Sequence, residues 1–253
     1  MRLLALEHFA AVPRDFLRVG RPKWDVVRPD KGERIPDLEP YDMLLVTGGP
    51  QNVWQGDKCP WLAAEKAAIR QFVVAMKRPY LGICLGHQLL AESIGGQVGP
   101  ANAPEVGIVP VRRTLAGLCD PLFRGFSDPF DVLQWHSAEV KSLPDGAAIL
   151  ASSETCKIQA FRYGKHAYGL QFQVGISDEM VSEGGTIPTY ATSLKHPFGA
   201  NAVADLDRRV AEKQPAFERD ARRLYKNFVP QLEADLHDRQ KELARWLMKV
   251  EMF

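Results

Sequence analysis

The chain has little net charge and no long hydrophobic run. Among its 253 residues, 32 Lys and Arg stand against 31 Asp and Glu, which leaves a formal net charge of +1. Such a balance provides no overall field to hold nucleic acid or an anionic membrane. The first apolar run, Leu3–Leu6, stops at Glu7 and is too short for a signal peptide or an anchor. We therefore expect a cytoplasmic protein with neither a nucleic-acid nor a membrane partner.

Cysteine is also scarce, and the spacing of the cysteines does not indicate a metal site. The four cysteines are too few and too scattered for a disulfide scaffold, and no two of them form a CxxC pair. No phosphate-binding glycine loop is present either. We expect no metal and no cofactor. The four are Cys59, Cys84, Cys119 and Cys156.

What the chain does have is a pattern of short apolar runs. In the first third they alternate with a helical pattern over residues 61–76, which is typical of βαβ units. Five β-type segments follow, separated by Gly and Pro turns, as in a mixed sheet. The sequence predicts an α/β protein with a central mixed sheet flanked by helices. The predicted strands are Leu3–Leu6, Trp24–Val27, Asp42–Val46, Tyr80–Ile83, Val106–Val111, Asp131–Trp135, Ala147–Ala151, Ile158–Tyr163 and Ala167–Phe172.

The C-terminal part is helical and charged. We expect one domain over residues 1–253, with a core of about 1–176 and a helical extension of about 177–253. Two helices divided near Pro230 are predicted there, because proline breaks a helix interior. A set of apolar residues falls on one helical face. We favour the interpretation that this face packs on its own domain. The alternative is that the face contacts a partner subunit. These residues are Leu236, Leu243, Leu247 and Val250, with Trp246 beside them.

The chemical centre is the sequence Gly-Ile-Cys-Leu-Gly at residues 82–86. It follows a buried-type strand and precedes a helix, which is the context of a nucleophile elbow. Cys84 would then lie at a helix N-terminus, where the dipole favours a thiolate. A lone cysteine is more often a small buried apolar residue, but the two flanking glycines favour the nucleophile here.

A second glycine turn, Gly48-Gly49-Pro50, ends the neighbouring predicted strand. Glycine would let a backbone N–H approach a reacting carbonyl, and with the N–H of Leu85 it could form an oxyanion hole. Alone, this tripeptide also makes an ordinary turn. Beside the elbow, it indicates acyl transfer.

Five stretches, in order over about 175 residues, resemble the class I glutamine amidotransferase family, including the amidotransferase domains of GMP synthase type. The resemblance implies a flavodoxin-like fold in which glutamine is cleaved through a cysteine thioester and its ammonia passes to a synthetase or acceptor partner. The stretches are VTGGPQNVW (46–54), YLGICLGHQLLAESIGG (80–96), EVG at Glu105, WHSAEV with LPDGAAILASS (135–153), and IQAFRYGKHAYGLQFQ (158–173).

The resemblance also implies roles for individual residues. Cys84 would be the nucleophile, and Gly49 and Leu85 would supply the oxyanion N–H groups. Four further residues would help to seat the glutamine: Gln88, Trp135, His136 and Ser137.

The family's catalytic His and Glu are missing. Where relatives have a QFHPE-like motif, this chain has Gln173 and Gly175. An amide has no usable proton affinity near neutral pH, and a positioned acid or base contributes on the order of 10²–10⁴ in rate. Among substitutes, we rank His136 and His196 ahead of His87. His166 is expected too far away, at the other end of the strand leading to Gln173.

Two functions from different classes remain open. The retained elbow and glycine turn favour an amidotransferase-like protein that binds glutamine or a γ-glutamyl amide at Cys84, with impaired glutaminase activity. The lost His and Glu favour a catalytically silent binding or regulatory subunit of a biosynthetic complex. Thiol chemistry on a different amide is a third interpretation.

Overall fold

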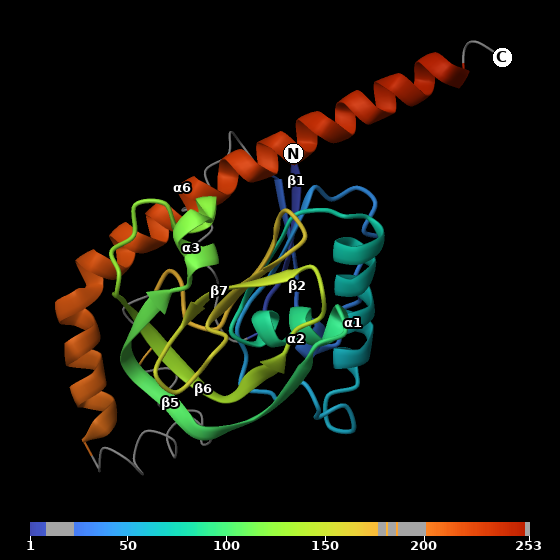
Figure 1. Cartoon of the computed structure of the whole chain (residues 1–253). Helices are drawn as coiled ribbons and strands as arrows, with labels where there is room; N and C mark the ends of the chain where they lie inside the picture. Colours follow the sequence, from blue (N-terminus) through green and yellow to red (C-terminus); the bar gives the residue numbers. More distant parts are fainter. Residues whose placement is uncertain (9–22, 177–180, 182–185, 187–200, 251–253) are drawn as a thin grey trace.

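A twisted mixed sheet forms the centre of the computed structural model, which describes residues 1–8, 23–176, 181, 186 and 201–250 (Figure 1). Within these residues the sheet has nine strands in the order β2-β1-β3-β4-β9-β8-β7-β5-β6. The strands are β1 (Arg2–Leu6), β2 (Lys23–Val27), β3 (Met43–Val46), β4 (Tyr80–Ile83), β5 (Gln97–Arg113), β6 (Phe130–Ser142), β7 (Ala147–Ser152), β8 (Ala160–Tyr163) and β9 (Ala167–Leu170).

The half of the sheet from β2 to β9 is parallel, and the other half is antiparallel. In β1, Leu3 and Ala5 join the hydrophobic core on one face, while Leu4 and Leu6 join the core on the other. Parallel strands covered on both faces need such continuous apolar runs, which is why the sequence located them well. The predicted mixed α/β fold is confirmed.

Helices cover both faces of this sheet. On one face lie α1 (Trp61–Arg70), which continues as a π-helical turn (Gln71–Ala75), and α2 (Leu85–Ser93); the other face is covered by α6 (Ala202–Val250). The short elements are α3 (Leu115–Cys119) and two 3₁₀ turns, Pro29–Lys31 and Pro121–Phe123. Of the described helices, none combines the length and apolar character needed to cross a membrane.

The predicted division of the C-terminal region near Pro230 is wrong. α6 is one helix of 49 residues that contains both Pro215 and Pro230. Tyr225 and Phe228 before Pro230, and Leu232 after it, are all fully buried against the sheet. Burial of each such side chain contributes about 1.5–3 kcal/mol, which together offsets the cost of about 3 kcal/mol of one interior proline.

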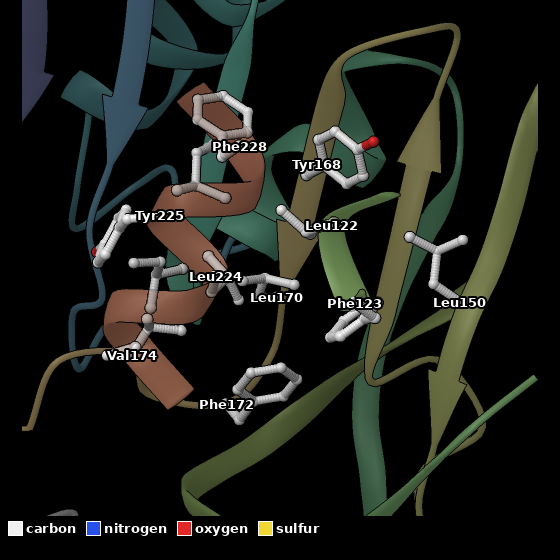
Figure 2. Close-up of a cluster of buried hydrophobic side chains, with 14 of the residues drawn as sticks. Leu122, Phe123, Leu150, Tyr168, Leu170, Phe172, Val174, Leu224, Tyr225 and Phe228 are labelled. Atoms are coloured by element: carbon white, nitrogen blue, oxygen red, sulfur yellow. The ribbon is translucent and has the colours of Figure 1, made fainter. Parts of the chain in front are cut away.

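The contact between α6 and the sheet also fixes the segment that follows β9. Figure 2 shows Leu224, Tyr225 and Phe228 of α6 packed over the chain that runs from Leu170 to Val174. The Tyr168 hydroxyl donates a hydrogen bond of 2.6 Å to Oε1 of Gln231, which ties the same helix to β9. The residues between Leu170 and Val174 therefore have little freedom, and they include the position where the family's base is missing.

Candidate active site

The elbow has the strand-turn-helix geometry that the sequence predicts. β4 ends at Ile83, α2 begins at Leu85, and Cys84 lies between them with φ 53° and ψ −102°. A non-glycine residue rarely adopts such a left-handed φ, so the surrounding packing must hold it. The two flanking glycines permit this packing: a Cβ on Gly86 would lie 2.3 Å from the Val46 carbonyl oxygen, and one on Gly82 would lie 2.5 Å from Gly86.

One pocket brings together seven residues predicted for the site, from three separate parts of the chain. The pocket is small, with about 30 Å³ of open volume. The seven residues are Gly49, Cys84, Leu85, Gln88, Trp135, His136 and Ser137, and Pro50, Gln51, Asn52 and Ala138 complete the lining.

The glycine turn after β3 lies directly against the elbow. A Cβ on Gly48 would be 3.2 Å from the Cβ of Cys84, and a Cβ on Gly49 would be 3.0 Å from Cδ2 of Leu85. Backbone can approach the cysteine this closely only because both residues lack side chains. The turn is therefore placed where an oxyanion hole requires backbone close to the nucleophile.

Amide groups surround the sulfur of Cys84. Nε2 of Gln171 lies 3.7 Å from Sγ, and the side chain of Gln173 and the N–H of Leu85 also donate to the thiol. Oε1 of Gln171 accepts a 3.0 Å hydrogen bond from Nε2 of Gln88. Gln171 thus connects the cysteine to a predicted substrate-binding residue, a role that its position in the sequence did not indicate.

The expectation that Cys84 is a stabilised thiolate is wrong for this structure. Burial raises the pKa of the Cys84 thiol to about 11, despite the opposing hydrogen bonds from Leu85, Gln173 and Gln171. The residue is only 4% exposed. The free energy lost when a thiolate is removed from water exceeds the free energy gained from hydrogen bonds with neutral N–H donors.

Gln173 occupies the position expected of the missing base. Its backbone N–H bonds to the Leu133 carbonyl at 3.0 Å, and its amide atoms lie 3.6 Å from where a Cβ on Gly48 would be. Gly175 has φ 76°. Both residues line a second small cavity beneath α6, whose walls include Phe172, Phe217 and Leu224.

His136 lines the pocket but is not free to act as a base. Its Nδ1 lies 2.9 Å from the Ala138 carbonyl oxygen, and its Nε2 lies 3.0 Å from Oε2 of Glu105. Burial acts to raise the pKa of Glu105, but hydrogen bonds from His136, Ser153 and Thr155 outweigh it and lower the value to about 2. Both ring nitrogens thus face acceptor oxygens, and neither is directed at Cys84 with a free lone pair.

Glu105 is the centre of a hydrogen-bonded cluster that positions His136. Oε1 accepts from Ser153 at 2.5 Å and from Thr155 at 2.6 Å. The ligand-type atoms of Glu105, His136 and Cys156 lie within 4.8 Å of one another. Burial, however, raises the pKa of Cys156 to about 12, which disfavours the thiolate that a metal needs. We assign this cluster to the support of His136.

The other histidines considered as substitutes for the missing base lie in different parts of the chain. Burial lowers the pKa of His87 to about 3, too low for a general base at neutral pH. His166 bonds through Nε2 to the Lys77 carbonyl oxygen at 2.6 Å, at the end of β9 opposite Gln173. His196 lies outside the described residues.

Sequence reasoning missed a buried contact between a histidine and a glutamate beneath the glycine turn. Nε2 of His8 lies 3.0 Å from Oε1 of Glu65, and both side chains are fully buried. The His8 ring stacks on Trp61 with centroids 4.7 Å apart, and its Cβ lies 3.1 Å from where a Cβ on Gly49 would be. The partners are 57 residues apart, so no local spacing could reveal them.

A nucleophile elbow at the carboxyl end of a parallel sheet, faced by a glycine turn from the neighbouring strand, is an arrangement of α/β proteins suited to acyl transfer. The family model described as glutamine amidotransferase class-I matches residues 13–172, which is more than half of the chain. The protein belongs to this family.

Three similar proteins illustrate the match. The glutamine amidotransferase-like protein YfeJ of Salmonella typhimurium is 39% identical over 154 residues, 59% of this chain and 64% of that protein. The glutamine-hydrolyzing GMP synthase subunit of Sulfurisphaera tokodaii is 36% identical over 58% of this chain and 73% of its own. The crystal structure of a glutamine amidotransferase from Thermotoga maritima has a TM-score of 0.77 at 28% identity, covering 90% of this chain and 98% of that one. The matched segment thus spans less than two thirds of the Salmonella relative.

Proposed function

We propose that this protein binds glutamine or a γ-glutamyl amide in the Cys84 pocket and cleaves it through a slowly formed thioester. The observation that carries the proposal is the convergence of Cys84, Gly49, Leu85, Gln88 and His136 on one pocket. A protein that kept only the fold would have no need of a strained elbow with backbone packed against its cysteine.

The chemistry would begin with attack of the Cys84 sulfur on the γ-carbonyl carbon. The N–H groups of Gly49 and Leu85 would stabilise the tetrahedral oxyanion, after which the C–N bond breaks and water hydrolyses the thioester. Gln173 can neither take the thiol proton nor protonate the departing amine. The proton transfers would fall to solvent or substrate, so turnover should be impaired by on the order of 10²–10⁴.

An acceptor protein would complete the reaction. Several relatives are named as subunits of a glutamine-hydrolyzing GMP synthase, which supports an assembly with a synthetase-type partner. Ammonia released beside Cys84 would then be used before it reaches bulk water.

Incubation with an alkylating glutamine analogue tests the proposal directly. We expect mass added at Cys84, protection by excess glutamine, and slow ammonia release from glutamine. Cys84→Ser should abolish the adduct and the ammonia, whereas Cys119→Ser, which removes an exposed cysteine outside the pocket, should leave the Cys84 adduct in place. The absence of both adduct and ammonia, with or without a synthetase partner, would overturn the enzymatic proposal.

A silent binding subunit is the second candidate function, and two observations favour it. The pKa of Cys84 is about 11, and both ring nitrogens of His136 are engaged. In that case calorimetry would detect glutamine binding while neither an adduct nor ammonia forms.

A further inference from the structure

Behind the glycine turn lies a pair of polar side chains that the proposed chemistry does not use. His8 comes just after β1, and Glu65 belongs to α1. Nε2 of His8 lies 3.0 Å from Oε1 of Glu65, and both side chains are fully buried. The His8 ring also stacks on Trp61, with an angle of 25° between the ring planes. The contact with Glu65 fixes the edge of the ring and the stack fixes its face, so the ring is held in one orientation.

Stability does not explain why the pair is polar. Within the part of the chain that the structure describes, neither Nδ1 of His8 nor Oε2 of Glu65 has a hydrogen-bond partner, although both atoms are buried. Buried polar atoms without partners lower the stability of a fold, and two apolar side chains of similar size would avoid that loss. Such departures from good packing concentrate at functional sites. The other contacts of the pair therefore indicate its role.

Two further contacts of His8 lead to the glycine turn. Its backbone N–H donates a 3.1 Å hydrogen bond to Oγ1 of Thr47, the residue directly before the turn. Its Cβ lies 3.1 Å from where a Cβ on Gly49 would be, and Cδ2 of Leu85 lies 3.0 Å from the same point. Gly49 thus lies against both His8 and the first residue of α2, without room for a side chain of its own.

We propose that His8 and Glu65 are positioning residues for the oxyanion hole, which hold the Gly49 N–H where it can donate to the oxyanion formed at Cys84. This inference rests on the proposed function, since only acyl transfer at Cys84 forms that oxyanion. Neither His8 nor Glu65 lines the Cys84 pocket, so both act through the turn.

The polar character of the pair suits this role. The rate gained from an oxyanion donor depends on its placement to within about 1 Å. Apolar packing has no preferred direction, whereas a hydrogen bond weakens when its angle changes. A ring held by Glu65 therefore places the turn more strictly than an apolar ring of the same shape.

Two reactions of the same sulfur separate this role from a structural one. In the first, Cys84 attacks the γ-carbonyl carbon of the γ-p-nitrophenyl ester of glutamate. The C–O bond breaks, p-nitrophenolate leaves with the electron pair, the thiol proton goes to solvent, and water then hydrolyses the thioester. This reaction passes through a tetrahedral oxyanion. In the second, the sulfur displaces iodide from iodoacetamide, and no oxyanion forms. The rate measured for Cys84→Ser is subtracted from each.

Replacement of the pair by apolar side chains gives the main variant. His8→Phe with Glu65→Leu keeps a ring on Trp61 and leaves neither partner buried alone, so the chain should fold, as circular dichroism checks. We expect nitrophenolate release to fall roughly ten- to a hundredfold, while alkylation by iodoacetamide keeps the rate of the parent. Glu65→Gln, which retains an oxygen to accept from Nε2, should lie between the parent and the double variant.

Glu92→Gln is the matched control, because it weakens the ion pair of the next residue on α1, Lys66. It should change neither rate. If the double variant unfolds, Glu65→Gln carries the same test, because it must slow ester cleavage alone.

The outcomes distinguish the two levels of the argument. A double variant that slows both reactions equally, or slows neither, overturns the positioning role. A parent protein that reacts with iodoacetamide but releases no nitrophenolate above Cys84→Ser overturns the proposed function instead, and the positioning role falls with it.

Discussion

Nε2 of His136 lies 3.0 Å from Oε2 of Glu105, and this contact determines what the pocket histidine can do. With Nδ1 directed at the Ala138 carbonyl, both ring nitrogens are engaged by acceptor oxygens. The ring therefore offers no atom to accept the proton of Cys84, and the loss of the family's histidine is not repaired at this position.

Glu105 should contribute to stability in a pH-dependent way. Its pKa falls from 4.5 to about 2 on folding, so this stability is fully present above about pH 4.5 and is lost as the pH falls toward 2. Glu105→Gln should lower the free energy of unfolding at pH 7 by on the order of 2–3 kcal/mol and flatten its acid dependence. Urea denaturation at pH 7 and pH 3 measures both effects. Glu154→Gln, at a neighbouring exposed position, is the control; equal losses in both variants would contradict this role.

The reactivity of Cys84 should rise steeply with pH. Only the thiolate is nucleophilic, and a pKa of about 11 predicts alkylation that accelerates about tenfold per pH unit from neutrality to about pH 10. The measurement is the rate of adduct formation at Cys84 by mass spectrometry, with intact fold verified at each pH. A rate that levels off near pH 7 would mean that a base activates the thiol after all.

The sheet and the pocket could be predicted from sequence because their determinants are local. Buried parallel strands are short apolar runs, and the elbow needs its glycines at fixed spacing around Cys84. β5 extends well before the predicted Val106, because its pairing with β6 continues through an irregularity between Pro100 and Glu105. Proline and glycine in that stretch had suggested turns, but the partner strand determines the pairing.

The remaining features of the site depend on contacts between residues that are far apart in the sequence, so no local sequence spacing predicts them. Glu105 meets His136 across 31 residues, and His8 meets Glu65 across 57. The pKa of Cys84 depends on how completely the fold covers it, which the helix N-terminus alone does not reveal. The prediction of two helices divided at Pro230 was wrong for a similar reason. Burial of the side chains on both sides of this proline outweighs the backbone hydrogen bond that it loses.

The elbow glycines should be intolerant of even one methyl group. In Gly86→Ala, the new Cβ would lie 2.3 Å from the Val46 carbonyl oxygen. The Cβ is fixed to the buried backbone of α2, and the oxygen belongs to the buried backbone of β3. We expect a loss of about 3 kcal/mol or more, because neither backbone can shift without repacking. Gly56→Ala, where a Cβ would meet nothing within 4 Å, should change stability by less than about 0.5 kcal/mol. Thermal denaturation compares the two, and similar losses would contradict the close approach.

Gln173→His should recover part of the missing glutaminase activity. Gln173 already lies against Cys84, so a histidine there could take the thiol proton. We expect glutaminase activity to rise, at the low end of the ~10²–10⁴ range of a positioned base, because no carboxylate orients the ring. Cys84→Ser in the same background should remove the gain. An unchanged rate would show that the pocket lacks more than its base.

Adding Gly175→Glu to Gln173→His should bring little further gain and a measurable cost. Gly175 has φ 76°, where a side chain costs about 1–2 kcal/mol, and the cavity that it lines is largely apolar. A carboxylate placed there would lose solvation without an assured partner. The double variant should therefore unfold at lower denaturant concentration than Gln173→His while its glutaminase rate stays within a few fold. A large rate increase at undiminished stability would show instead that the backbone at this position relaxes to accept the family's original pair.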